Sequence, residues 1–216
     1  ILLVIGQMDF FQMMKKVFLK RVEKANKIKK NTRTTLFSYE AVPFHFNGDL
    51  REFIGHHKDY PNFIIESINK MDKKWSVYNW ELGELIQRVG GSINQILTEV
   101  IANSDLSTLH KIIDLLRSIE PPDLDLCFKI VEKTSDKQIW KGVGASIYAT
   151  GVVSGEYGIA NAYQGKLNEI QKRKDDKNPN IKKFVSWMSK SLETSIIKEK
   201  QRVQEELKLR KIEFEG

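Results

Sequence analysis

The sequence predicts an all-α protein of paired antiparallel helices, arranged as a short solenoid or as an irregular helical bundle. Apolar residues recur at spacings of three and four from residue 79 to residue 212, which is the period of one buried helix face. Glycine and proline interrupt this pattern at Gly90-Gly91, Pro121-Pro122, Gly151 and Pro179. No stretch sustains the alternation of a half-buried strand, so we expect little sheet.

Residues 1–33 predict a helical segment that is apolar at its start and basic at its end. They carry nine basic side chains and two acidic ones, whereas residues 34–216 carry 26 of each. Gln7, Asp9 and Gln12 interrupt the apolar run before it reaches the roughly 20 residues that a bilayer span requires. The basic residues follow the apolar run, which is the reverse of a secretory signal. An apolar stretch followed by basic residues also fits an amphipathic helix lying on a membrane surface. We expect instead a helix that packs on its own protein, and no membrane partner.

Residues 34–48 predict an extended connector, because they have no helical period and contain Pro43. A helical-repeat domain is expected over residues 49–216. Its helices are expected to begin at residues that cap or pre-set a first turn, with a long helix from Pro179 to Ile212 at the end. These starting residues are Asp49, Pro61, Ser92, Ser104, Asp123, Ser135, Tyr157 and Pro179.

The spacing of the helix starts favours the solenoid, since they pair into units of roughly 30–45 residues. The segment from residue 176 to residue 184 resembles the turn of HEAT repeats, in which an Asp precedes a Pro, an aliphatic residue and a basic residue. Asp176, Pro179, Ile181 and Lys182 match that pattern. We expect Pro179 to pre-set the first turn of the helix and Asp176 to cap it. Lys182 stands where Arg is usual, and Val185 stands where a small Ala is usual.

The helix pairs followed by a long charged helix, from Ser191 to Lys211, are similar to a part of large bacterial antiphage defence proteins. That part is their carboxy-terminal helical-repeat region, which follows an enzymatic effector or an NTPase. The resemblance implies a module that senses a target or holds an oligomer together. The chain starts at Ile1 without an initiator Met, which suggests a part of a longer protein.

The sequence offers no catalytic, metal-binding or cofactor-binding site. There is no phosphate-binding glycine loop, and Gly142–Ser146 lies inside a helical pattern, where small residues let another helix approach. The histidines, His45, His56, His57 and His110, have no metal-ligand spacing. Cys127 lies on an apolar face as a buried thiol, and a single cysteine is compatible with the cytoplasm. We expect no enzyme activity, no cofactor and no small-molecule substrate from this segment.

With no enzyme activity or small-molecule substrate expected, the function is expected to be the binding of a macromolecule. Protein binding or self-association is the leading interpretation. Candidate protein-interface residues are Phe10 and Phe11 in the first segment, and Val203, Leu207 and Ile212 on the terminal helix from Trp187 onward. The same residues can instead pack on their own chain, and helix length alone does not separate the two arrangements.

The alternative function is nucleic-acid binding through two basic clusters, at residues 15–33 and 172–183. Their candidate contact residues are Lys15, Lys16, Lys20, Arg21, Lys172, Arg173, Lys174, Lys182 and Lys183. Solvated lysines at helix ends give the same pattern, because charge alone does not specify a ligand.

Overall fold

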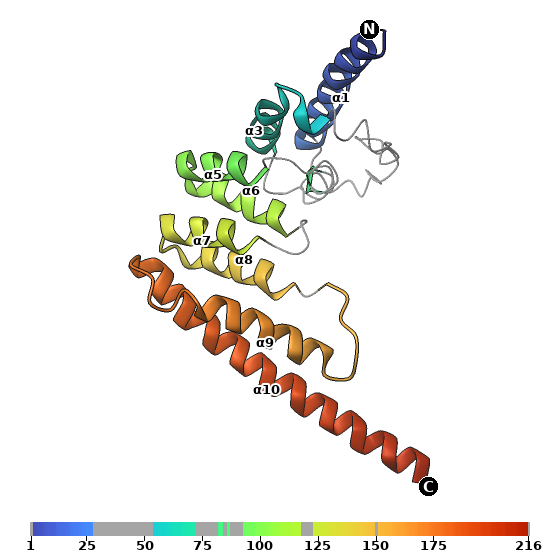
Figure 1. Cartoon of the computed structure of the whole chain (residues 1–216), viewed down its shortest axis with the longest axis vertical. Coiled ribbons are helices and arrows are strands. Elements are labelled where there is room, and N and C mark those ends of the chain that lie inside the picture. The colour runs from blue at the N-terminus through green and yellow to red at the C-terminus, as the bar shows by residue number, and fades with distance from the viewer. Residues whose placement is uncertain are drawn as a thin grey trace. The chain divides into compact units, whose positions relative to one another are not determined.

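The computed structural model describes residues 2–27, 54–71, 82–83, 86, 93–117, 123–149 and 151–215 (Figure 1). All the regular elements in these ranges are helices, and no strand occurs in them. The prediction of an all-α protein is confirmed. The connector expected at residues 34–48 and the caps expected at Asp49 and Ser92 lie outside the described residues.

The chain divides into two compact units, Ile1–Ile119 and Glu120–Gly216. The first unit contains helices α1 (Leu2–Lys27), α3 (Tyr60–Lys70), α5 (Ile93–Asn103) and α6 (Leu106–Leu116). The second contains α7 (Leu124–Lys133), α8 (Lys137–Tyr148), α9 (Gly158–Gln171) and α10 (Pro179–Glu215). The amino-terminal helix thus belongs to the same unit as α3.

Aromatic rings hold α1 on α3 in the first unit. Phe63 on α3 is fully buried and meets Phe11 and Phe18 of α1 edge to face, with ring centroids 6.1 and 5.5 Å apart. Lys15 and Glu66 form an ion pair beside these rings, with 3.0 Å between Nζ and Oε2. The apolar stripe of α1 therefore faces α3.

Phe184 is the centre of the core in the second unit. Its fully buried ring lies 6.4 Å from Phe128 on α7 and 5.8 Å from Trp140 on α8, both nearly perpendicular to it. Figure 1 shows α9 lying along α10, and the buried face of α9 includes Leu167 and Ile170. The first part of α10 thus packs on α7 and α8, and α9 runs antiparallel along α10 from the turn that joins them.

The turn that resembles a HEAT repeat is capped differently from the expectation. Asn178 accepts hydrogen bonds from the backbone N–H groups of Asn180 and Ile181, at 2.8 and 3.4 Å, and Pro179 occupies the first helical position. Asp176 instead accepts the N–H of Asn178 at 2.9 Å. The side chain directly before the proline reaches the free N–H groups, so Asn178 is the cap and Asp176 shapes the turn.

Two other caps lie one residue beyond the expected serines. Asp105 caps α6 by accepting the N–H of Thr108, and Asp136 caps α8 by accepting those of Gln138 and Ile139. The expectation for Ser135 was wrong, because the extended backbone before α8 is at Asp136. Asp123 caps α7, as expected.

Candidate interaction surface

The side chains of His57 and Cys127, which could carry chemistry, are packed against other residues of the fold. The imidazole of His57 stacks on Phe11 with centroids 3.8 Å apart, and its Nδ1 accepts the N–H of Asp59. Cys127 is fully buried, and burial raises the pKa of its thiol to about 12. The described residues contain no cluster of His, Cys, Asp and Glu side chains that could hold a metal ion.

A cavity of about 260 Å³ lies between α3 and the α5–α6 turn of the first unit. Polar groups on its lining bond to backbone carbonyls within their own helix or turn: Ser104 donates to Val100, and Asn103 donates to Glu99. Its other lining residues are Ile65, Asn69 and Thr108. This arrangement concentrates neither charge nor a catalytic group.

Small residues on α8 let α10 approach closely, as the sequence predicted. A Cβ atom placed on Gly144 would lie 3.1 Å from Cη2 of Trp187 and 3.4 Å from the sulfur of Met188. The indole of Trp187 therefore crosses α8 at Gly144. The Phe184 ring is tilted against the indole, with the two ring centroids 5.6 Å apart. The ring remains 39% exposed.

Helices α8 and α10 run in the same direction around this contact. Trp140 meets Phe184, Gly144 meets Trp187, and Tyr148 donates to Ser191, so contacts advance along both helices together. The exposed residues one turn from Gly144 or Trp187 consequently flank the exposed part of the indole.

Three lysines occupy these neighbouring positions. Lys141 precedes Gly144 by three residues, Lys183 precedes Trp187 by four, and Lys190 follows it by three. All three are exposed, and none forms an ion pair within the described part of the chain. We call Trp187 with these three lysines the α8–α10 patch.

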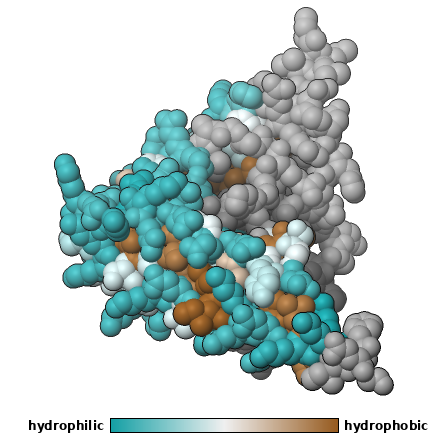
Figure 2. Space-filling model, turned by 60° about the horizontal axis from the view of Figure 1, so that its bottom comes forward, coloured by the Kyte–Doolittle hydropathy of each residue, from teal (hydrophilic) through white to brown (hydrophobic). Residues whose placement is uncertain are grey.

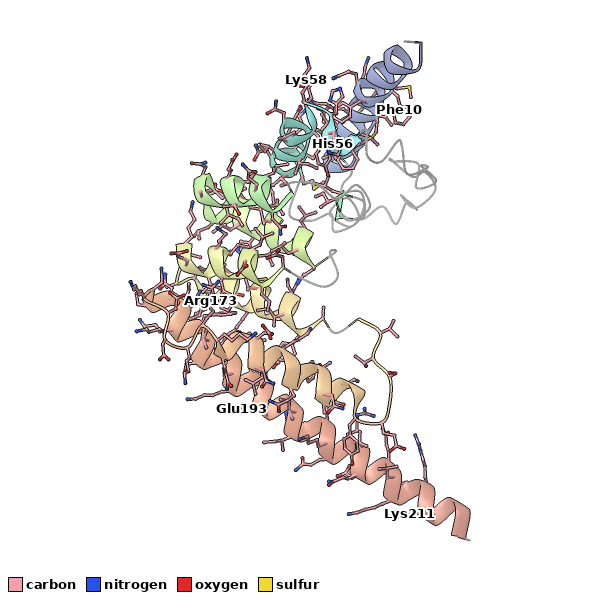
Figure 3. All side chains as sticks on the ribbon, viewed as in Figure 1. Phe10, His56, Lys58, Arg173, Glu193 and Lys211 are labelled. Atoms are coloured by element: carbon pink, nitrogen blue, oxygen red, sulfur yellow. The ribbon has the colours of Figure 1, made fainter. Side chains whose placement is uncertain are left out.

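A second exposed apolar side chain lies further along α10. Ile197 is 57% exposed and lies ten residues after Trp187, a separation of about 15 Å at the helical rise of 1.5 Å per residue. Glu193 projects from α10 between them (Figure 3). Small hydrophobic patches within a mostly hydrophilic surface are visible on the face shown in Figure 2.

The expected apolar interface residues are mostly used inside their own units. Phe11 is fully buried against α3, and Phe10 is half-buried. Val203 is only 4% exposed, and further along α10 Arg210 lies 3.6 Å from Glu156, which precedes α9. Phe11 and Val203 are therefore packed within their own units, which is the arrangement that the sequence left open beside contact with another chain. Leu207 is half-buried, and the side chain of Ile212 lies outside the described residues.

The basic cluster on α1 is partly neutralised. Lys15 pairs with Glu66, which also binds Lys70, and Lys70 pairs with Glu23 at 2.9 Å. Lys16 and Lys20 are exposed, while the side chain of Arg21 lies outside the described residues.

The basic cluster at the α9–α10 turn is also partly paired. Lys172 pairs with Glu169 at 2.6 Å. Arg173 pairs with Asp125 on α7 at 2.9 Å and lies over the Phe128 ring, so it fixes the turn to α7 (Figure 3). Lys174, Lys182 and Lys183 are exposed and have no ion pair among the described residues.

Comparison with known proteins gives no relative for this chain. No family model matches the sequence, and no match was found among curated proteins or solved structures. None of the described helices is long and apolar enough to cross a bilayer.

Proposed function

We propose that this chain is a non-catalytic helical module that binds another protein. One observation carries the proposal: Trp187 and Ile197 are exposed on α10, while the opposite side of that helix is packed on α7 and α9. Large aromatic side chains beside other exposed apolar groups are typical of protein-binding surfaces, because a partner can remove their area from water.

The finer form of the proposal is a HEAT-like repeat array that senses a target or scaffolds an oligomer within a larger antiphage defence protein. Its support is the short turn motif around Pro179 and the succession of helix pairs in the sequence. The catalytic function of such a protein would belong to another part of it.

Quantitative affinity capture from the source cells tests the proposal, with the whole chain as bait. The replacement Ile197→Asp should reduce capture of a reproducible partner at least tenfold, because it places a charge in the apolar contact. Val152→Asp is the matched control, since Val152 is fully exposed in the loop before α9. Light scattering of both variants separates target binding from self-association. Absence of both a partner and an oligomer would refute the proposal.

Nucleic-acid binding is the second candidate, favoured by the exposed and unpaired Lys174, Lys182 and Lys183. Binding through such lysines should weaken steeply between about 50 and 200 mM salt, because counterions are released from the phosphates. Titration of labelled DNA and RNA over that range tests this candidate. Loss of binding in a Lys182→Glu, Lys183→Glu double variant would place the contact at the turn.

A further inference from the structure

We propose that the α8–α10 patch binds an acidic segment of the partner protein, with apolar anchors seated on Trp187 and Ile197. This inference rests on the proposed function and specifies the chemistry of the partner. The partner is a helix or extended peptide that carries aspartate and glutamate beside two apolar side chains.

Charge complementarity determines the kind of partner. Lys141, Lys183 and Lys190 flank the indole from two helices, and they form no ion pair in the described structure. Three positive charges without ion pairs attract an anionic surface and repel a cationic one. Glu193 borders the patch on α10 and lowers this attraction on one side.

The packing of Trp187 makes the surface rigid before binding. Its ring is fixed between Gly144 and Phe184, so little side-chain entropy remains to be lost when a partner covers the exposed part. A rigid aromatic ring with a polar rim has the composition of an interface hot spot.

The second anchor favours a peptide over a nucleic acid. Ile197 is exposed about 15 Å beyond Trp187 and offers nothing to a phosphate, whereas an apolar side chain of a peptide can bury it. The lysines alone would serve either ligand. The separation suits anchors about ten or eleven residues apart on a partner helix.

A second copy of this chain is a poorer match for the same surface. It carries the same three lysines and the same net charge of +7, so it offers the patch no complementary charge. Like charges across a contact oppose association. The surface therefore fits a partner that differs from this chain in charge.

Fluorescence anisotropy of the whole chain with a labelled amphipathic peptide tests the inference. The probe is a helix of about 18 residues with leucine on one face and glutamate elsewhere, and the same peptide with lysine in place of glutamate is its counterpart. A single strand of about 20 thymidines is the third probe. We expect the glutamate peptide to bind at least tenfold more tightly than the other two.

Charge reversal on the chain locates the contact. The double variant Lys141→Glu, Lys190→Glu should weaken binding of the glutamate peptide at least tenfold, and Glu193→Lys should strengthen it. The matched control is Lys174→Glu with Lys177→Glu, two exposed lysines in the turn before α10, which should change affinity less than threefold. Circular dichroism confirms that every variant is folded.

The possible results separate this inference from the proposed function. Equal binding of both peptides, preferential binding of the thymidine strand, or full affinity in the Lys141, Lys190 variant would overturn the acidic-segment proposal. A self-association that Ile197→Asp abolishes would also overturn it, since a second copy would then cover the surface. In each case a partner whose capture depends on Ile197 would still support the protein-binding function.

Discussion

The phenol of Tyr148 on α8 donates a hydrogen bond to the hydroxyl of Ser191 on α10, with the two oxygens 2.8 Å apart. The same phenol oxygen lies 3.2 Å from the hydroxyl of Ser195, one turn further along α10. These contacts continue the row in which Trp140 and Gly144 meet α10, so they fix the register of the two helices beneath the α8–α10 patch.

Removal of the Tyr148 hydroxyl should therefore loosen the second unit. We expect Tyr148→Phe to lower the free energy of unfolding by about 1 kcal/mol, because a half-buried hydrogen bond is lost while the ring remains. Urea denaturation followed by circular dichroism measures the change. Tyr163→Phe is the control, since Tyr163 stacks edge to face on Tyr148 and its hydroxyl makes no hydrogen bond with the residues that the structure describes. A loss equal to that of Tyr148→Phe in the control would contradict this assignment.

Glycines on two helices should respond in opposite ways to a larger side chain. Gly165 on α9 has open space around it, so Gly165→Ala should stabilise the protein by about 0.5–1 kcal/mol through helix propensity. Gly144→Leu should destabilise it by about 1–3 kcal/mol, because the added atoms enter the position of the Trp187 ring. Thermal unfolding of both variants checks the signs, and stabilisation by Gly144→Leu would refute the close approach of α8 and α10.

The helix caps show how far local sequence reasoning could reach. The apolar period and the breaks at proline and glycine were sufficient to predict α6, α7, α8 and α10, because each helix buries one face. The apolar period does not determine which of two adjacent polar residues caps a helix, since both Ser135 and Asp136 are of types that form caps. The backbone angles decide that choice, and they depend on how α7 turns into α8.

This difference has a direct test in two single variants. We expect Asp136→Ala to destabilise the protein by about 1 kcal/mol, because the N–H groups of Gln138 and Ile139 lose their acceptor. Ser135→Ala should change stability by less than about 0.5 kcal/mol, as expected for an exposed residue outside the cap. Urea midpoints of the two variants measure both effects. The reverse order would restore Ser135 as the cap.

Contacts between residues far apart in the sequence could not be predicted in this way. Arg173 pairs with Asp125, 48 positions earlier, and Glu156 lies beside Arg210. The first pair engages Arg173 of the basic cluster, and the second joins the segment before α9 to the far part of α10. Exposure of Trp187 and Ile197 likewise depends on which helices α10 meets. The sequence therefore predicts the terminal helix as a contact element, but it does not show which apolar residues that helix exposes.

The ion-pair network between α1 and α3 should make the first unit sensitive to acid. A hydrogen bond from Lys15 lowers the pKa of Glu66 below its usual 4.5, and one from Lys70 adds to this effect against the opposing influence of burial. Because the pKa is lower in the folded state, the carboxylate stabilises the fold above pH 4.5. That stabilisation is lost as the pH falls through the folded-state pKa.

The variant Glu66→Gln removes this charge and tests its pH dependence. At neutral pH we expect it to be less stable than the parent protein by at most about 1 kcal/mol, since the side chain is partly exposed and water screens the pair. The difference should shrink as the pH falls below 4.5, where the parent carboxyl becomes protonated. Hydrogen exchange of α1 and α3 at several pH values follows it locally. A difference that grows toward acid would have the wrong sign for this network.

Cys127 gives a chemical measure of the second unit as a whole. Its side chain is fully buried on α7 beside the core, and burial, together with the charge of Asp123, raises the pKa of the thiol to about 12. Only the thiolate reacts with a disulfide reagent, so the folded protein should resist labelling near pH 8, where a free thiol of pKa about 8.5 reacts readily. Labelling in urea is the control and should reach one thiol per chain.

The same labelling reports on the packing of α7. Because α7 packs on both α8 and α10, the slow labelling rate in the native state should rise in the Tyr148→Phe variant, which weakens the same packing. Rapid labelling of the native parent protein would show that α7 does not bury this residue, and with it the support of α10 beneath Trp187 would be lost.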